Sequence, residues 1–223
     1  MCKNKEELTK VYEINMFRHF TDEQKAILKN YKFPKYEYYA HPENNEYLIV
    51  EPKGKKCECC GELKQVLFDC SGTYGSHRND DLYVCPECLS SGLAGDKLDI
   101  ISGLVYDFSY QTYIKYDKIT DPEKIRQVEK CTPPILTAND MEFRTHCNDF
   151  AEYIGEVYYQ DIKNLGKQDI KDIKEDLKLN KKEFMLKFRE LKECNPDNED
   201  MCLFVHLFRC KHCGKYLVQV DLD

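Results

Sequence analysis

Apolar residues recur every three or four positions between residues 161 and 193. This spacing places apolar side chains on one face of a helix. Turns are expected near Gly166 and Asn180, and they would divide the segment into two helices. Basic and acidic residues nearly balance along it, so its polar face is interpreted as a solvated surface and not as a nucleic-acid-binding stripe.

Local signals predict three further helices. Thr21 can act as an N-cap, with Gln24 at the capping-box position of a helix near the start of the chain. Residues 90–104 suit a short helix. A longer helix is expected from residue 137 toward residue 154, which would carry His146 on one face.

Short strands are expected beside the cysteine-containing turns. Val66–Cys70 and Tyr83-Val84 are typical of strands, and residues 202–209 and 216–220 flank a turn as the two arms of a hairpin. Glu51–Gly54 contains proline and glycine and is interpreted as a turn.

Cysteine content changes this picture most. The chain has 223 residues, enough to bury a core, and contains 13 cysteines but no tryptophan. Its polar start predicts no signal peptide, and no apolar run is long enough for a membrane helix. We therefore expect a cytoplasmic protein with reduced thiols. An odd number of cysteines cannot pair completely, so metal ligation is the favoured role.

Two Cys-x-x-Cys pairs have the spacing of a structural zinc site. Each pair forms a tight turn that directs two thiolates and nearby backbone N–H groups at one cation. The predicted ligands are Cys57, Cys60, Cys85 and Cys88. Inert buried cysteines or a redox pair are the alternatives. Cys59 could replace Cys57, but its thiol is expected to point outward.

A third pair, Cys210 and Cys213, lies in the turn of the predicted C-terminal hairpin. It needs two more ligands, for which His146 and Cys147 are the favoured source. Because adjacent residues reach one metal only by distorting the backbone, one of these two is expected to bind while the other packs. His206 and His212 are competing donors. A second zinc ion is thus a candidate that spacing alone leaves open.

Several motifs occur in the order found in the CbrC-like family of bacterial proteins, which the chain resembles over residues 33–223. They are Phe33–Pro42, Cys57–Gly61, Cys85–Leu89, His146–Asp149 and Leu207–Tyr216. The resemblance implies a cytoplasmic protein with a role in stress or in tolerance of a colicin, a toxin made by competing bacteria. It implies no reaction.

These observations predict an α+β protein in which a zinc ribbon and a C-terminal zinc-knuckle hairpin are covered by helices. Residues 1–33 are expected to form a helical extension, and residues 34–223 the CbrC-like zinc-binding domain.

Charge and motifs together limit the function. The formal net charge of −7 argues against nucleic-acid binding, although a zinc-ribbon nucleic-acid protein remains an alternative. The chain has no P-loop, no His-Glu-x-x-His motif and no zinc-deaminase signature. A metal enzyme with an open zinc site at the C-terminal pair is the other alternative. The favoured hypothesis is a non-enzymatic protein that binds a basic, nuclease-type toxin. Sequence names neither that partner nor an oligomeric state.

Overall fold

The computed structural model describes residues 20–73, 81–105, 117–135, 142–157, 165–178, 182, 186 and 203–222. These residues form two compact units, each assembled from several stretches of chain. Unit 1 takes the described residues of 1–37, 41–103 and 126–136, and unit 2 takes those of 38–40, 104–125 and 137–223. The predicted domain boundary after residue 33 stays a prediction.

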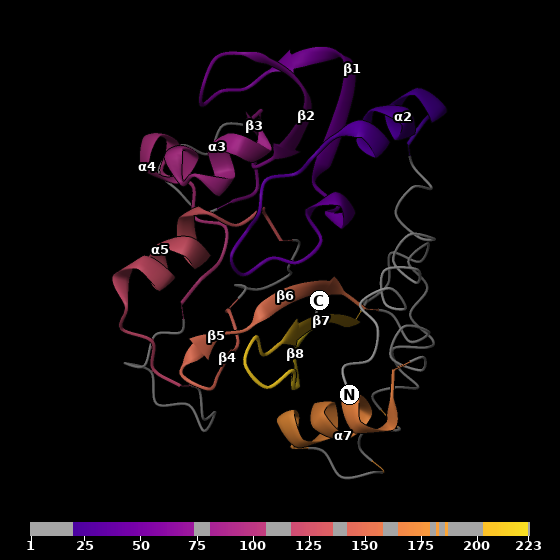
Figure 1. Cartoon of the computed structure of the whole chain (residues 1–223), viewed down its shortest axis with the longest axis vertical. Helices are drawn as coiled ribbons and strands as arrows, with labels where there is room; N and C mark the ends of the chain where they lie inside the picture. Colours follow the sequence, from indigo (N-terminus) through magenta and orange to yellow (C-terminus); the bar gives the residue numbers. More distant parts are fainter. Residues whose placement is uncertain are drawn as a thin grey trace. The chain divides into compact units, whose positions relative to one another are not determined.

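Unit 1 is built on a three-stranded antiparallel sheet in the order β1-β2-β3 (Figure 1). The strands are β1 (Leu48–Lys56), β2 (Leu63–Asp69) and β3 (Tyr83–Val84). Helices α2 (Asp22–Asn30), α3 (Pro86–Ser90) and α4 (Leu93–Leu98) and the 3-10 turn η1 (Pro42–Asn44) belong to the same unit. Helix α5 (Pro122–Lys130) is divided between the units: its residues up to Ile125 belong to unit 2, and those from Arg126 belong to unit 1. Fully buried side chains of β2, β3 and α3 form the core: Leu67, Phe68, Val84 and Leu89.

Helix α2 begins as the sequence predicts. The Thr21 side chain accepts a hydrogen bond from the Gln24 backbone, and the Gln24 side chain accepts one from the Thr21 backbone. Gln24 Nε2 also donates to the Val50 carbonyl at 2.7 Å. The capping box therefore both starts the helix and fastens it to strand β1.

The predicted turn at Glu51–Gly54 is wrong, because these residues continue strand β1. The pairing of β1 with β2 shifts register between Val50 and Lys55. A bulge of this kind leaves residues out of the ladder, so Pro52 needs no N–H there, and Gly54 adopts a φ of +78°. Proline and glycine mark an irregular strand here, not its end.

Unit 2 contains a second antiparallel sheet in the order β6-β7-β8 (Figure 1). Its strands are β6 (Glu152–Glu156), β7 (Leu203–Arg209) and β8 (Tyr216–Leu222), and the last two form the predicted C-terminal hairpin. A small ribbon of β4 (Thr145–His146) and β5 (Asp149–Phe150) precedes it. Helix α7 (Lys167–Asp176) lies against β8. Of the helices expected between 161 and 193, α7 is described, and most of the second lies outside the described residues.

Aromatic rings form the core of unit 2. Phe143 and Tyr153 both contact the buried ring of Phe208 edge-on, at centroid distances of 5.5 and 5.3 Å. The backbone of Tyr153 also donates to Tyr38 and accepts from Ala40, so residues 38–40 cover the outer edge of β6. This pairing protects a strand edge that would otherwise be exposed.

The helix predicted from residue 137 toward 154 is wrong over its described part. Residues 145–156 form strands β4, β5 and β6 instead. Cys147 and Asn148 have φ angles of +56° and +55°, which a right-handed helix cannot contain. Pairing of β6 with the distant strand β7 outweighs the local capping signal.

Helices and small antiparallel sheets together confirm the predicted α+β class. The short helix expected within residues 90–104 is present as α4, whereas α3 ends at Ser90 and was not expected. Within the described part of the chain, no helix has the length and apolar character needed to cross a membrane.

Asp176, at the end of α7, makes a buried connection that should dominate the stability of unit 2. It accepts from Arg144 Nη2 at 2.7 Å and from the backbone N–H of Val218 in β8 at 2.9 Å. Side chains of the ion pair are only 10% and 11% exposed. Asp176→Ala should lower the free energy of unfolding by about 3 kcal/mol, because it removes the charge facing a buried guanidinium. Chemical denaturation measures this. Asp172→Ala, on the same helix, is the control and should change it by less than about 0.5 kcal/mol.

Candidate metal centres

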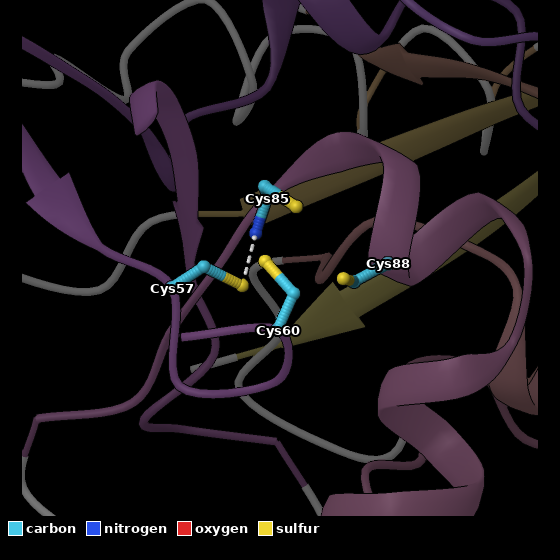
Figure 2. Close-up of side chains that lie close together, drawn as sticks. All are labelled: Cys57, Cys60, Cys85 and Cys88. Carbon is cyan, nitrogen blue, oxygen red and sulfur yellow. Dashed lines mark hydrogen bonds between the residues drawn. The ribbon is translucent and has the colours of Figure 1, made fainter. Parts of the chain in front are cut away.

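Four thiols converge in unit 1 (Figure 2). Their sulfur atoms all lie within 4.8 Å of one another, and we call this cluster site 1: Cys57, Cys60, Cys85 and Cys88. The first two follow strand β1, while Cys85 is the N-cap of helix α3 and Cys88 lies in its first turn. Four sulfur atoms bound to one zinc ion at about 2.3 Å would lie about 3.8 Å apart. The cluster is therefore compact enough to hold a metal ion.

The turn at Cys57–Gly61 has the backbone form that a metal knuckle needs. Cys57 donates its N–H to Glu62, and Gly61 donates back to the Cys57 carbonyl, both at 2.8 Å. Gly61 has a φ of +78°, which only glycine adopts readily. The Cys85 backbone N–H donates to the Cys57 sulfur at 3.3 Å, and this bond is drawn in Figure 2. Backbone N–H donors of this kind stabilise a thiolate even without a bound cation.

Electrostatic conditions in site 1 favour a bound cation. A hydrogen bond from the Cys85 thiol, together with backbone N–H groups, lowers the pKa of Cys57 to about 4. The same contact with Cys57 raises the pKa of Cys85, and burial raises that of Cys88. These crowded sulfur atoms cannot all carry charge by themselves, since each thiolate opposes the next. A divalent cation removes that conflict.

Cys59 differs from its prediction. Its thiol was expected to point outward, but the residue is only 1% exposed, whereas Cys60 is exposed. Burial raises the pKa of the Cys59 thiol above the ordinary value. Cys59 is not one of the four residues of the cluster. The expectation failed because spacing identifies the turn but does not fix which way its middle residues face.

A second cluster, site 2, lies in unit 2. One nitrogen or sulfur atom from each of four residues falls within 4.8 Å of the others: His146, Cys147, Cys210 and Cys213. His146 Nδ1 is 3.1 Å from the Cys147 sulfur and 3.5 Å from the Cys213 sulfur. Cys210 directly follows strand β7 and Cys213 lies in the hairpin turn, so the C-terminal hairpin supplies half of the donors.

The hairpin turn repeats the backbone of the first knuckle. Cys210 donates its N–H to Lys215 at 2.8 Å, and Gly214 donates to the Cys210 carbonyl at 2.9 Å. Gly214 has a φ of +75°, close to that of Gly61. Although burial opposes it, the N–H groups of Cys213 and His212 lower the pKa of Cys210 to about 6. Glycine after the second cysteine is therefore a sequence signal with a physical cause.

His146 and Cys147 both enter site 2, whereas the sequence predicts that only one of them binds. The expected backbone distortion is present, because Cys147 and Asn148 take left-handed φ angles. Asp117 supports this turn by accepting the Asn148 N–H at 2.8 Å. Distortion thus brings both adjacent donors to the cluster.

The two competing histidines lie elsewhere. His206 is fully buried, and its Nδ1 is 3.2 Å from the Tyr153 hydroxyl. His212 directs Nε2 to Asp149 at 2.9 Å. Neither is part of site 2.

Asp149 connects the two halves of site 2, a role that sequence reasoning missed. It is buried just after the His146-Cys147 turn and accepts hydrogen bonds from Tyr38 at 2.9 Å and from His212, inside the knuckle, at 2.9 Å. Lys124 forms an ion pair with it at 2.9 Å. Although burial opposes it, hydrogen bonds from Lys124, His212 and Tyr38 lower the pKa of Asp149 to about 2. The one signal in the sequence for this role is that Asp149 belongs to the motif His146–Asp149.

The donor chemistry of both sites suits a metal ion. Site 1 offers four thiolates, and site 2 offers three with an imidazole. Such sets favour tetrahedral binding of a soft or borderline divalent cation. Both clusters could therefore hold a metal ion, with the predicted ligands collected in each.

Comparison with known proteins identifies the family of the chain. The chain is a protein with two cysteine-rich candidate metal centres on small sheets. A family model described as an uncharacterised protein family (UPF0167) matches residues 33–222, so the chain belongs to that family. The CbrC family is this same family, and the resemblance is confirmed to that level. Both candidate centres lie inside the matched region. No solved structure matches the chain.

Replacing one ligand of site 1 should release its metal and weaken unit 1. We expect Cys85→Ser to reduce the metal content by about one ion per chain and to lower the Tm by roughly 10 °C, since ligand binding is coupled to folding. Elemental analysis and calorimetry measure the two effects. Cys70→Ser changes a buried cysteine outside both clusters and should keep the full metal content. Unchanged metal in Cys85→Ser would contradict the assignment of site 1.

Removing the charge of Asp149 should loosen site 2 alone. Asp149→Asn keeps the size of the side chain but weakens its hydrogen bonds to Lys124 and His212. We expect metal affinity at site 2 to fall roughly tenfold while site 1 is unchanged. Competition with a chromophoric chelator resolves the two classes of site. Asp172→Asn is the matched control, and an equal loss in that variant would rule out a specific role for Asp149.

Proposed function

We propose that the protein is a non-enzymatic, zinc-stabilised interaction module that gives tolerance to a basic, nuclease-type bacterial toxin. The observation that carries the non-enzymatic part is the donor count. Each cluster has four protein donors, which complete a tetrahedral set. Structural zinc sites are closed in this way, whereas catalytic ones keep a position for water or substrate.

Zinc is the metal that this proposal assigns to both sites. Four thiolates, or three thiolates with one imidazole, are the ligand sets of structural zinc. Such sites supply folding energy directly, so each unit would depend on its own ion. No disulfide joins the described cysteines, which supports a reducing cytoplasm as the working compartment.

Charge supports the choice of partner. The chain carries a formal net charge of −7, and an acidic protein attracts a basic one over distances comparable to the Debye length. Nuclease toxins are basic because they bind nucleic acid, so an acidic neutraliser suits them. The CbrC-like resemblance adds the connection with colicin tolerance.

Binding to a basic nuclease domain tests this function. Calorimetry with the purified zinc-loaded chain should detect association with a nuclease-type colicin domain at low salt. Affinity should fall by about tenfold or more between about 50 and 300 mM salt, because charge steers the encounter. Lysozyme, which is also basic, is the control for unspecific attraction.

Two results would contradict the proposal. Absence of binding at low salt removes the toxin partner, and equal binding to lysozyme removes its specificity. Metal analysis that finds a water-bearing, three-ligand ion in either site would instead favour a metal enzyme.

A further inference from the structure

Site 1 is assembled from two separate segments of the chain, and helix α4 connects them. The first segment is the knuckle turn Cys57–Gly61, and the second is helix α3 with its N-cap, which carries the other two cysteines of the site. Only two residues separate the end of α3 from the start of α4. Near the end of α4, Lys97 Nζ donates a hydrogen bond to the carbonyl of Cys59, inside the knuckle turn. Helix α4 therefore continues one half of the site and contacts the other.

Hydrogen bonds fix the junction between α3 and α4. The Ser91 hydroxyl donates to the Cys88 carbonyl at 3.2 Å, and the Gly92 N–H donates to the Leu89 carbonyl at 2.8 Å. These contacts set the direction in which α4 leaves α3. The position of Lys97 is thereby tied to that of Cys88, a predicted ligand of site 1.

Helix α4 also packs tightly against the unit 1 part of α5. A Cβ atom added to Gly95 would lie only 2.6 Å from the Cβ of Lys130, so only glycine permits this approach. Asp96 forms ion pairs with Arg126 at 2.9 Å and with Lys130 at 2.8 Å. Because α4 is held at its start and along its length, Lys97 reaches the knuckle from a fixed element.

A lysine suits this contact for two reasons. The hydrogen bond from an ammonium group to the Cys59 carbonyl is charge-assisted, and such bonds are stronger than neutral ones. Four thiolates around one divalent cation also leave an excess of negative charge at site 1. A cation bound to the knuckle backbone lowers the energetic cost of that excess.

We propose that Lys97 is a positioning residue of site 1, which holds the first knuckle against α3 at the separation that one metal ion requires. Lys97 is not itself one of the four donors. Its role parallels that of Asp149, which connects the two halves of site 2. This inference rests on the proposed metal in site 1.

Cadmium-113 NMR with the full chain tests this role. Cd²⁺ is a soft cation that binds thiolate sites of this kind. Its chemical shift depends on the number of bound sulfur atoms, so site 1 with four and site 2 with three are observed separately. A chelator is added in steps to the cadmium-loaded protein. Lys97→Met should lose the site 1 signal at an about tenfold lower free chelator concentration than wild type, whereas the site 2 signal should be unchanged.

Two variants separate positioning from a general loss of stability. Lys97→Arg keeps a charged donor on α4 and should bind metal at site 1 within about threefold of wild type. Lys53→Met removes an exposed lysine from strand β1 of the same unit and should leave both signals unchanged.

The possible failures are distinguishable. Wild-type affinity in Lys97→Met, or an equal loss in Lys97→Arg or Lys53→Met, overturns the inference and leaves the metal in site 1 intact. If wild-type protein gives no four-sulfur signal, the proposed metal in site 1 fails, and the proposed function fails with it.

Discussion

Crowding of sulfur atoms is the constraint on which the rest of the structure depends. There are two sets of four donors, and within each set the donor atoms lie within 4.8 Å of one another. Several thiols in them have raised pKa values because a neighbouring sulfur or burial opposes their ionisation. Only a cation allows all of them to be charged together. Each small sheet thus carries a cluster of crowded donors, and their close spacing is most favourable when a metal ion is bound.

The same backbone device builds half of each site, and different devices build the other half. Cys57 and Cys210 each begin a turn that glycine closes with a positive φ. In unit 1 the second pair of donors comes from the start of helix α3, where Pro86 occupies the first position. In unit 2 it comes from a turn with two left-handed non-glycine residues. Such strain persists only where surrounding contacts hold it, and Asp117 and Asp149 supply them.

Sequence reasoning succeeded where the signal is local. The pattern Cys-x-x-Cys-Gly predicts the knuckles, and Thr21 with Gln24 predicts the start of α2, because turn and cap chemistry involve neighbouring residues. All eight residues proposed for the two sites are brought into the predicted clusters. The helix expected across residues 145–154 failed because pairing with β7 is non-local. The burial of the Cys59 side chain and the hydrogen bonds of Asp149 also depend on residues far away in the sequence. Rules based on the spacing of neighbouring residues do not include such contacts.

Four protein donors at each site would complete the coordination of a tetrahedral metal ion, and this limits how the protein can act. A saturated metal offers no position for substrate, so recognition would have to use the surfaces that the metal holds in shape. Each unit has its own cluster, and the two clusters share no residue. Under the proposed function, metal supply and thiol reduction would control whether those surfaces exist, and charge would control which partners approach them. In that proposal, zinc dependence and the net negative charge are separate requirements for the same interaction, and they would fail under different conditions: chelation would remove the metal, and salt would weaken the attraction.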